Sequence, residues 1–111
     1  MKKKTEDTKL IIEIMEYIKR EANDVCVDKY ALAKEIYALF TPLGLTKKEE
    51  AREKRKLQEI LKALRVLGLA EMELIPHDDY RGIPWLATSG YRLTERGLRF
   101  LKMLKETLTQ I

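Results

Sequence analysis

The stretch from residue 46 to 67 constrains the fold most, because it predicts one long helix with two different faces. At about 100° per residue, its apolar side chains fall on one side of the helix. They are Leu57, Ile60, Leu61, Leu64 and Leu67. The opposite side is basic apart from Glu59, and carries Lys48, Arg52, Arg55 and Lys62. Such a pattern is typical of a DNA-reading helix, and also of an ordinary solvated surface helix.

The surplus of positive charge lies in this same helix. Residues 46–67 carry eight basic against four acidic side chains, a surplus that equals the net charge of +4 of the whole chain. Residues 1–24 and residues 25–45 each sum to zero. A localised basic surface is the electrostatic footprint expected of a protein that binds phosphates.

Length and composition bound the class of protein. A chain of 111 residues has room for one modest core, so we expect a single domain over residues 1–111, with residues 1–7 as a flexible basic tail. No apolar run approaches the roughly 18 residues of a membrane helix. The single cysteine, Cys26, cannot form an internal disulfide. We therefore expect a cytoplasmic protein with no membrane partner, and its charged residues (36%) and few amides resemble thermophile usage.

The remaining sequence predicts an α+β fold that is mostly helical. We expect a first helix from Asp7 or Thr8 to about residue 21, a second over residues 29–40 capped by Asp28, and a last one over residues 95–110. Residues 69–74 alternate as a half-buried strand does, and residues 85–93 predict a second strand. Residues 25–27 are long enough only for a minor edge strand.

Local signals mark where these elements begin and end. Thr46 and Glu49 predict a capping box at the start of the long helix, and Gly68 is a good residue for its end. Thr94 is expected to cap the last helix. Residues 76–84 are dense in turn formers, and Gly90 predicts a bulge or a close approach of two segments.

Two phrases in the sequence resemble regulators of the PadR and MarR kind from bacteria and archaea. The first phrase, L-x-x-L-x-x-x-G-L-x-E, comprises Leu61, Leu64, Gly68, Leu69 and Glu71. The second, Y-x-L-T-x-x-G-x-x-x-L, comprises Tyr91, Leu93, Thr94, Gly97 and Leu101. The resemblance implies a winged helix-turn-helix domain with a long third helix, a wing of two or three strands and a C-terminal helix.

One departure from that family concerns length. Leu32 and Gly68 are 36 positions apart, farther than in compact relatives. We expect the second helix to be longer by a turn and the third to extend by about two turns at its N-terminal end. Over that extension the core-facing positions hold Glu49, Glu50 and Glu53. The first turns should therefore project beyond the core.

The resemblance also implies how such a protein meets DNA, with the third helix in the major groove and the wing beside the backbone. We expect Arg52 and Arg55 to read bases and Lys48 and Lys62 to contact phosphates. Three further candidates lie at the edges of the helix or at the tip of the wing: Lys47, Lys56 and Arg81. Asp78 and Asp79, close to Arg81 in sequence, would weaken its attraction to DNA.

The last helix carries Leu101, Leu104, Leu108 and Ile111 at the spacing of a heptad seam. This seam could pack on the chain's own core beside the first helix. It could instead bury itself against a second copy, and we expect a homodimer that presents two long helices to double-stranded DNA.

Two functions from different classes follow. The first is a DNA-binding transcriptional regulator. The alternative is a winged-helix interaction module in a larger assembly that does not bind DNA, which the acidic wing and the glutamates of the long helix favour. We expect neither an enzyme nor a cofactor or metal site, because no catalytic constellation is present and His77, Asp78 and Asp79 are adjacent residues that cannot easily converge on one ion.

Overall fold

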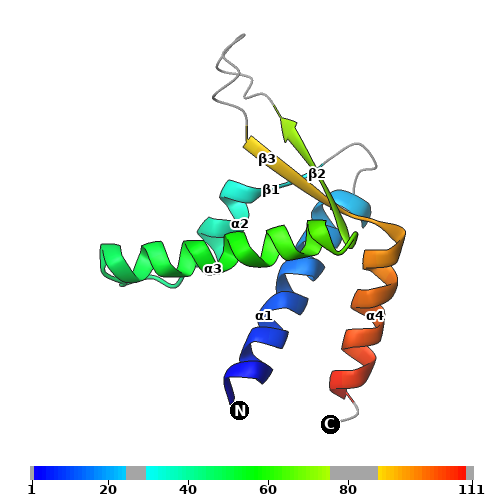
Figure 1. Ribbon diagram of the computed structural model, residues 1–111, viewed down its shortest axis with the longest axis horizontal. Helices are drawn as coiled ribbons and strands as arrows, with labels where there is room; N and C mark the ends of the chain where they lie inside the picture. Colours follow the sequence, from blue (N-terminus) through cyan, green and yellow to red (C-terminus); the bar gives the residue numbers. More distant parts are fainter. Residues whose placement is uncertain (1, 25–29, 76–87, 110–111) are drawn as a thin grey trace.

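The computed structural model of the chain describes residues 2–24, 30–75 and 88–109 (Figure 1). The fold is α+β and mostly helical, as predicted. Its elements, in order, are α1 (Lys2–Ile18), the π-helix η1 (Lys19–Asp24), β1 (Ala31–Leu32), α2 (Ala33–Phe40), α3 (Lys47–Val66), β2 (Ala70–Ile75), β3 (Thr88–Leu93) and α4 (Glu95–Thr109). Among the described helices, none combines the length and apolar character that crossing a membrane requires.

The three strands form one antiparallel sheet in the order β1-β3-β2. β2 and β3 pair residue for residue over their whole length, so the ladder contains no bulge at Gly90. The alternative prediction for this glycine, a close approach, is confirmed. A Cβ atom there would lie 2.3 Å from Cδ1 of Ile75 and 2.7 Å from Cβ of Tyr30.

The π-helix completes the edge of β3 that β1 leaves open. The side chain of Asn23 donates from Nδ2 to the carbonyl of Leu93 at 3.0 Å, and Leu93 N–H donates to its Oδ1 at 3.2 Å. The amide group thus supplies the two hydrogen bonds that a neighbouring strand would supply.

The core lies where α1, α2, α3 and the sheet meet. Its largest fully buried side chains are Ile14, Met15, Ile18, Ile36, Leu57 and Leu61. The predicted apolar face of α3 is confirmed at Leu57, Leu61 and Leu64, which are the buried positions of that helix. Leu67 departs from it with 57% of its surface exposed, because it lies at the end of the helix, on the flank rather than the centre of the apolar face.

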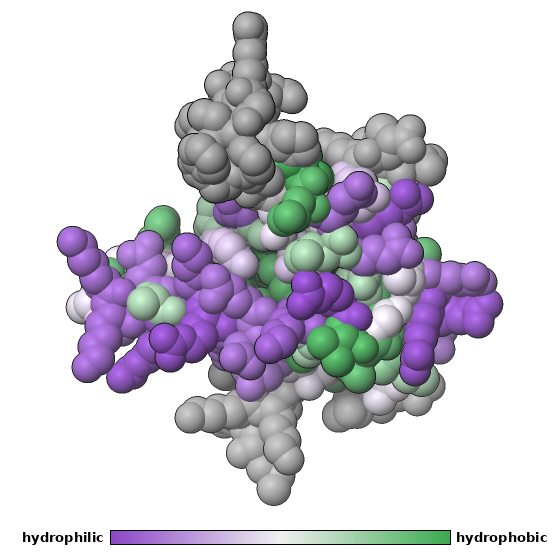
Figure 2. All heavy atoms as spheres, turned by 45° about the horizontal axis from the view of Figure 1, so that its top comes forward, coloured by the Kyte–Doolittle hydropathy of each residue, from purple (hydrophilic) through white to green (hydrophobic). Residues whose placement is uncertain are grey.

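The first half of α3 projects beyond the core, as predicted. Leu57 is the first buried residue of the helix, and between Lys47 and Lys56 every side chain is exposed except the half-buried Glu53. We call residues 46–56 the overhang. Figure 1 shows it extending sideways from the body of the molecule, and Figure 2 shows it as a mostly hydrophilic arm.

Two predicted element boundaries are wrong. α1 begins at Lys2 rather than at Asp7 or Thr8, because lysine and glutamate favour helix and no glycine or proline interrupts residues 2–8. α2 has eight residues and begins at Ala33, because Ala31 and Leu32 pair with β3 instead of joining the helix. The extra chain length therefore lies in the turn after α2 and in α3. The predicted strand at 25–27 and the Asp28 cap lie outside the described residues.

α3 ends and α4 begins at one shared contact. Gly68 has a φ of +75°, and the N–H groups of Gly68 and Leu69 donate to the carbonyls of Arg65 and Leu64, which is the Schellman pattern of helix ends. Thr94 donates its N–H to the Leu69 carbonyl at 3.0 Å and its hydroxyl to the Gly68 carbonyl at 2.6 Å.

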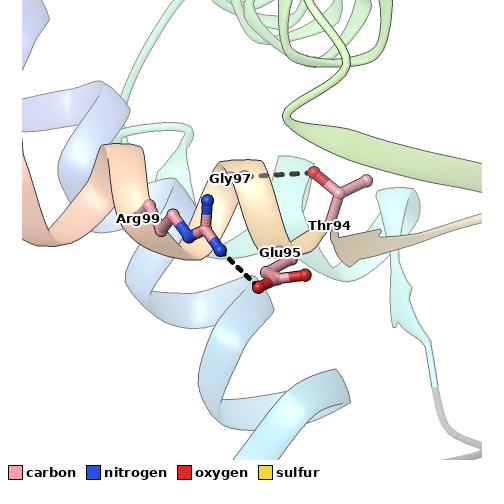
Figure 3. Close-up of polar contacts among 4 residues, drawn as sticks. All are labelled: Thr94, Glu95, Gly97 and Arg99. Carbon is pink, nitrogen blue, oxygen red and sulfur yellow. Dashed lines mark hydrogen bonds and ion pairs between the residues drawn. The ribbon is translucent and has the colours of Figure 1, made fainter.

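Thr94 also caps α4, as predicted, because its Oγ1 accepts the N–H of Gly97 at 3.0 Å (Figure 3). Gly97 lies directly against the end of α3. A Cβ atom at this position would lie 1.9 Å from the carbonyl oxygen of Leu69. The glycine of the second sequence phrase is therefore required by the close passage of α4 over the backbone of Leu69.

We expect Gly97→Ala to lower the free energy of unfolding by about 2 kcal/mol, because α4 must move away from Leu69. Gly44→Ala is the matched control. Gly44 has a φ of +81° but open space around it, so only backbone strain of about 1 kcal/mol is expected there. Chemical denaturation of both variants measures the difference, and a smaller loss for Gly97→Ala than for Gly44→Ala would contradict the close-contact account.

Candidate nucleic-acid interface

The four basic side chains predicted to share one face of α3 form an exposed surface. We call them the basic stripe: Lys48, Arg52, Arg55 and Lys62. Within the described parts of the chain, none of the four is held in an ion pair. Three of them lie on the overhang, so their charges stand out from the body of the protein. Glu59, also exposed, interrupts the stripe.

Lys56 does not belong with the stripe. Its Nζ lies 2.7 Å from Oδ1 of Asp7, so the side chain is turned toward α1. One residue advances the helix by about 100°, which carries Lys56 away from the side that Arg55 occupies. The predicted role of Lys56 at the edge of a DNA-contacting face therefore competes with this ion pair.

The opposite flank of the overhang faces α2. Lys47 is exposed on this flank, about two turns of the helix before Lys54. The Nζ of Lys54 lies 5.5 Å from the centre of the Tyr37 ring, a cation–π contact. Burial raises the pKa of Tyr37, although a hydrogen bond from Gln58 opposes this shift. The Tyr37 side chain thus stays neutral near physiological pH. Its contact with Lys54 joins α3 to α2.

Arg65 and Val66 extend the surface beyond the predicted residues. The Nη1 of Arg65 lies 3.4 Å from Sδ of Met72, so this arginine connects α3 to β2. Val66 follows Lys62 by four residues and is 70% exposed, which gives the stripe an apolar end. Continuing the helical period past Lys62 in sequence would have identified Val66. The contact of Arg65 with β2 had no sequence signal.

The carboxylates of the overhang lie away from the stripe. Glu49 completes the predicted capping box: its backbone N–H donates to Oγ1 of Thr46 at 3.2 Å, and its Oε1 accepts the Thr46 N–H at 3.3 Å. Glu49 and Glu50 lie in the first turn, where the helix dipole favours negative charge. The glutamates thus stabilise the start of the helix from the side opposite the cations.

Charged side chains from both strands lie at the base of the hairpin. Glu71 of β2 lies directly opposite Arg92 of β3. A hydrogen bond to Glu73 raises the pKa of Tyr30, which places these two side chains on the same surface. Arg81, which was predicted at the tip of a wing, lies outside the described residues, as does the sequence from His77 to Asp79.

The apolar seam of α4 is used, at least in part, by the chain itself. Leu101 is only 2% exposed and belongs to the core, and Leu104 is half-buried against that core. Of the two uses predicted for the seam, packing on the chain's own core therefore holds for these residues. Leu108 is half-buried, and Ile111 lies outside the described residues.

Comparison of the sequence with known proteins finds neither a matching family model nor a matching curated protein. The chemistry of the surface thus has to be judged from its own residues. The four cations of the basic stripe are exposed on one face of α3, and the only acidic member of that face of the helix is Glu59. Such a surface suits a partner that presents closely spaced negative charges.

The overhang should depend on its cap, because none of its residues is buried in the core. We expect Thr46→Ala to cost about 1 kcal/mol of local helix stability and to speed amide hydrogen exchange in the first turns of α3. The global melting temperature should hardly change. Thr94→Ala is the matched control, since that cap is part of the contact between α3 and α4 and its loss should lower the melting temperature. Equal effects of the two variants on melting would contradict the independence of the overhang.

Proposed function

We propose that this chain is a winged helix-turn-helix protein that binds double-stranded DNA with α3 and regulates transcription. The observation that carries the proposal is the basic stripe, whose cations are exposed and form no ion pair with other described residues. Side chains held in this way cost little to bring against phosphates, because no existing ion pair has to be broken.

The order of the elements supports this proposal. A helix, a short strand, two helices, a hairpin and a final helix follow one another, and β3 lies between β1 and β2. In the winged-helix interpretation, α2 and α3 form the helix-turn-helix and β2 and β3 form the wing. The turn between α2 and α3 includes Gly44, whose φ of +81° lets the chain reverse direction there.

The dimensions of the overhang also suit a major groove. Ten helical residues from Lys47 to Lys56 extend roughly 15 Å, and the major groove is about 12 Å wide. The overhang can thus lie in the groove while the body of the protein stays outside. The glutamates opposite the stripe then face away from the phosphates.

The roles within the stripe follow from side-chain chemistry. Arg52 and Arg55 are three residues apart and lie roughly 4.5 Å apart along the helix axis, close to the spacing of about 3.4 Å between successive bases. Each guanidinium can donate two hydrogen bonds to a guanine. Lys48 and Lys62 lie toward the two ends of the stripe, where their point charges can neutralise phosphates.

A second candidate function rests on exposed leucines beside the overhang. Leu43 in the turn after α2 is 98% exposed, and Leu39 of α2 is 62% exposed. Water is an unfavourable environment for both, and a protein surface would bury them. In this alternative, the helix-turn-helix corner is a docking surface within a larger assembly, and DNA is not a ligand.

The charge reversal Arg55→Glu tests the assignment of the groove. We expect it to abolish binding to duplex DNA because it places a carboxylate among the phosphates, while the melting curve stays unchanged for so exposed a residue. Lys102→Glu is the control, since it makes the same change in net charge at an exposed position on α4. Titration of both variants by mobility shift measures the effect, and wild-type affinity in Arg55→Glu would overturn the assignment.

Salt dependence separates the two candidate functions. Binding to random duplex should weaken steeply as salt rises, with a logarithmic slope of about −0.9 per phosphate contact. Lys48→Ala should reduce the steepness of that slope by about one contact, and the matched Lys9→Ala on α1 should leave it unchanged. Absence of duplex binding at low salt, with the fold intact, would favour the docking alternative.

A further inference from the structure

An apolar groove lies between α1, the second half of α3 and α4. Its volume is about 390 Å³, and its floor and walls include Ile11, Ile60, Leu67 and Phe100. A second hollow of about 300 Å³ adjoins it, shares Leu67, Leu69 and Phe100 with it, and adds Met103. The two hollows therefore form one continuous apolar surface on the side of α3 that faces away from α2.

This surface holds side chains that water does not favour. Leu67 is 57% exposed and Met103 is 53% exposed, and both lie on neighbouring helices along the same groove. Figure 2 shows apolar side chains near the C-terminal end of α3, bordered by hydrophilic ones. A contiguous apolar patch with a polar rim is the usual form of a protein–protein contact surface.

The two rims of the groove carry opposite charge. The rim formed by α1 and α3 has Asp7, Lys56 and Glu59, and because Asp7 and Lys56 neutralise each other at 2.7 Å, Glu59 leaves it acidic. The rim formed by α4 has Arg96 and Arg99.

The two arginines differ in whether they already have an ion-pair partner within the chain. Arg99 is paired with Glu95 of its own helix at 2.6 Å (Figure 3). Arg96 and Glu59 have no ion-pair partner among the residues that the structure describes. One unpaired charge of each sign therefore borders the groove, on opposite sides of its apolar floor.

We propose that this groove is the homodimer interface, in which a second copy of the chain docks by two-fold symmetry. In a two-fold contact each residue meets its counterpart reciprocally. Glu59 of each copy can then meet Arg96 of the other, while Leu67 and Met103 are buried at the centre. A surface with one acidic and one basic rim is complementary to itself in this way, whereas a partner of different sequence would need a matching pair of rims of its own.

The inference rests on the homodimer expected for the proposed DNA-binding function. It places the dimer contact on a different side of α4 from the heptad seam predicted from the sequence. Leu101 and Leu104 face the chain's own core, so the interface lies on the adjacent side of α4, at Phe100 and Met103. None of the four cations of the basic stripe lines the groove, although Glu59, which interrupts the stripe, does. Lys56 is the one overhang residue on the rim, so the stripe cations of both overhangs remain uncovered in the dimer.

The oligomeric state in the absence of DNA tests the inference. Sedimentation equilibrium of the full chain should give twice the monomer mass of 13.0 kDa at micromolar concentration. Leu67→Glu should raise the dissociation constant of the dimer by roughly tenfold or more, because it places a charge at the centre of an apolar contact. Leu43→Glu is the matched control, an exposed leucine that does not line the groove and should leave the constant unchanged.

A charge exchange tests the two-fold geometry and does not depend on the apolar core of the groove. Glu59→Arg and Arg96→Glu should each weaken the dimer by creating like charges across the interface. The double variant should restore the wild-type dissociation constant to within roughly twofold, as expected when two groups interact directly. Unchanged melting curves verify that each variant is folded.

The outcomes are distinct from those of DNA binding. A monomer at micromolar concentration, or a dimer that neither Leu67→Glu nor the charge exchange affects, overturns the proposed interface even if duplex binding is tight. A dimer that responds as expected supports the interface even if duplex DNA is not bound, and in that case only the proposed function fails.

Discussion

The contact between the end of α3 and the start of α4 determines how the β2–β3 hairpin and α4 are placed relative to the rest of the molecule. The hydroxyl of Thr94 donates to Gly68, and its backbone N–H donates to Leu69. The missing side chain of Gly97 lets α4 lie against the Leu69 carbonyl. Since β2 begins and β3 ends at this contact, it closes the base of the hairpin. It also sends α4 back along α1 (Figure 1).

The two halves of α3 are consequently stabilised by different interactions. The second half is held by buried leucines and by the turn at Gly68. The overhang is held instead by its capping box, by the contacts of Lys54 with Tyr37 and of Lys56 with Asp7, and by its continuity with the second half. An isolated helix of about ten residues is marginal in water. Like charges four residues apart, such as Lys48 and Arg52, weaken it further. A polyanion bound along the basic stripe would relieve that repulsion, so ligand binding and helix order should reinforce each other.

Sequence reasoning succeeded where the determining interactions are local. The caps at Thr46 and Thr94 and the helix end at Gly68 each depend on residues within one or two turns, and all three were predicted. The start of α2 was wrong because residues 31–32 pair with β3, far along the chain, and such pairing overrides helix propensity. The exposed cations of the stripe followed from helical period alone. The turning of Lys56 toward Asp7 did not, because the position of α1 relative to α3 is a property of the tertiary fold.

The amide of Asn23 has a consequence for how copies of this chain can associate. A strand with unsatisfied backbone groups invites another strand to pair with it. On one side of β3, the short β1 and the Asn23 side chain occupy those groups. At the opposite edge of the sheet, β2 exposes Glu71 and Glu73. Their negative charges would repel the same residues of an identical strand placed beside them. Extension of the described sheet by a strand of a second copy is thus disfavoured at both of its edges.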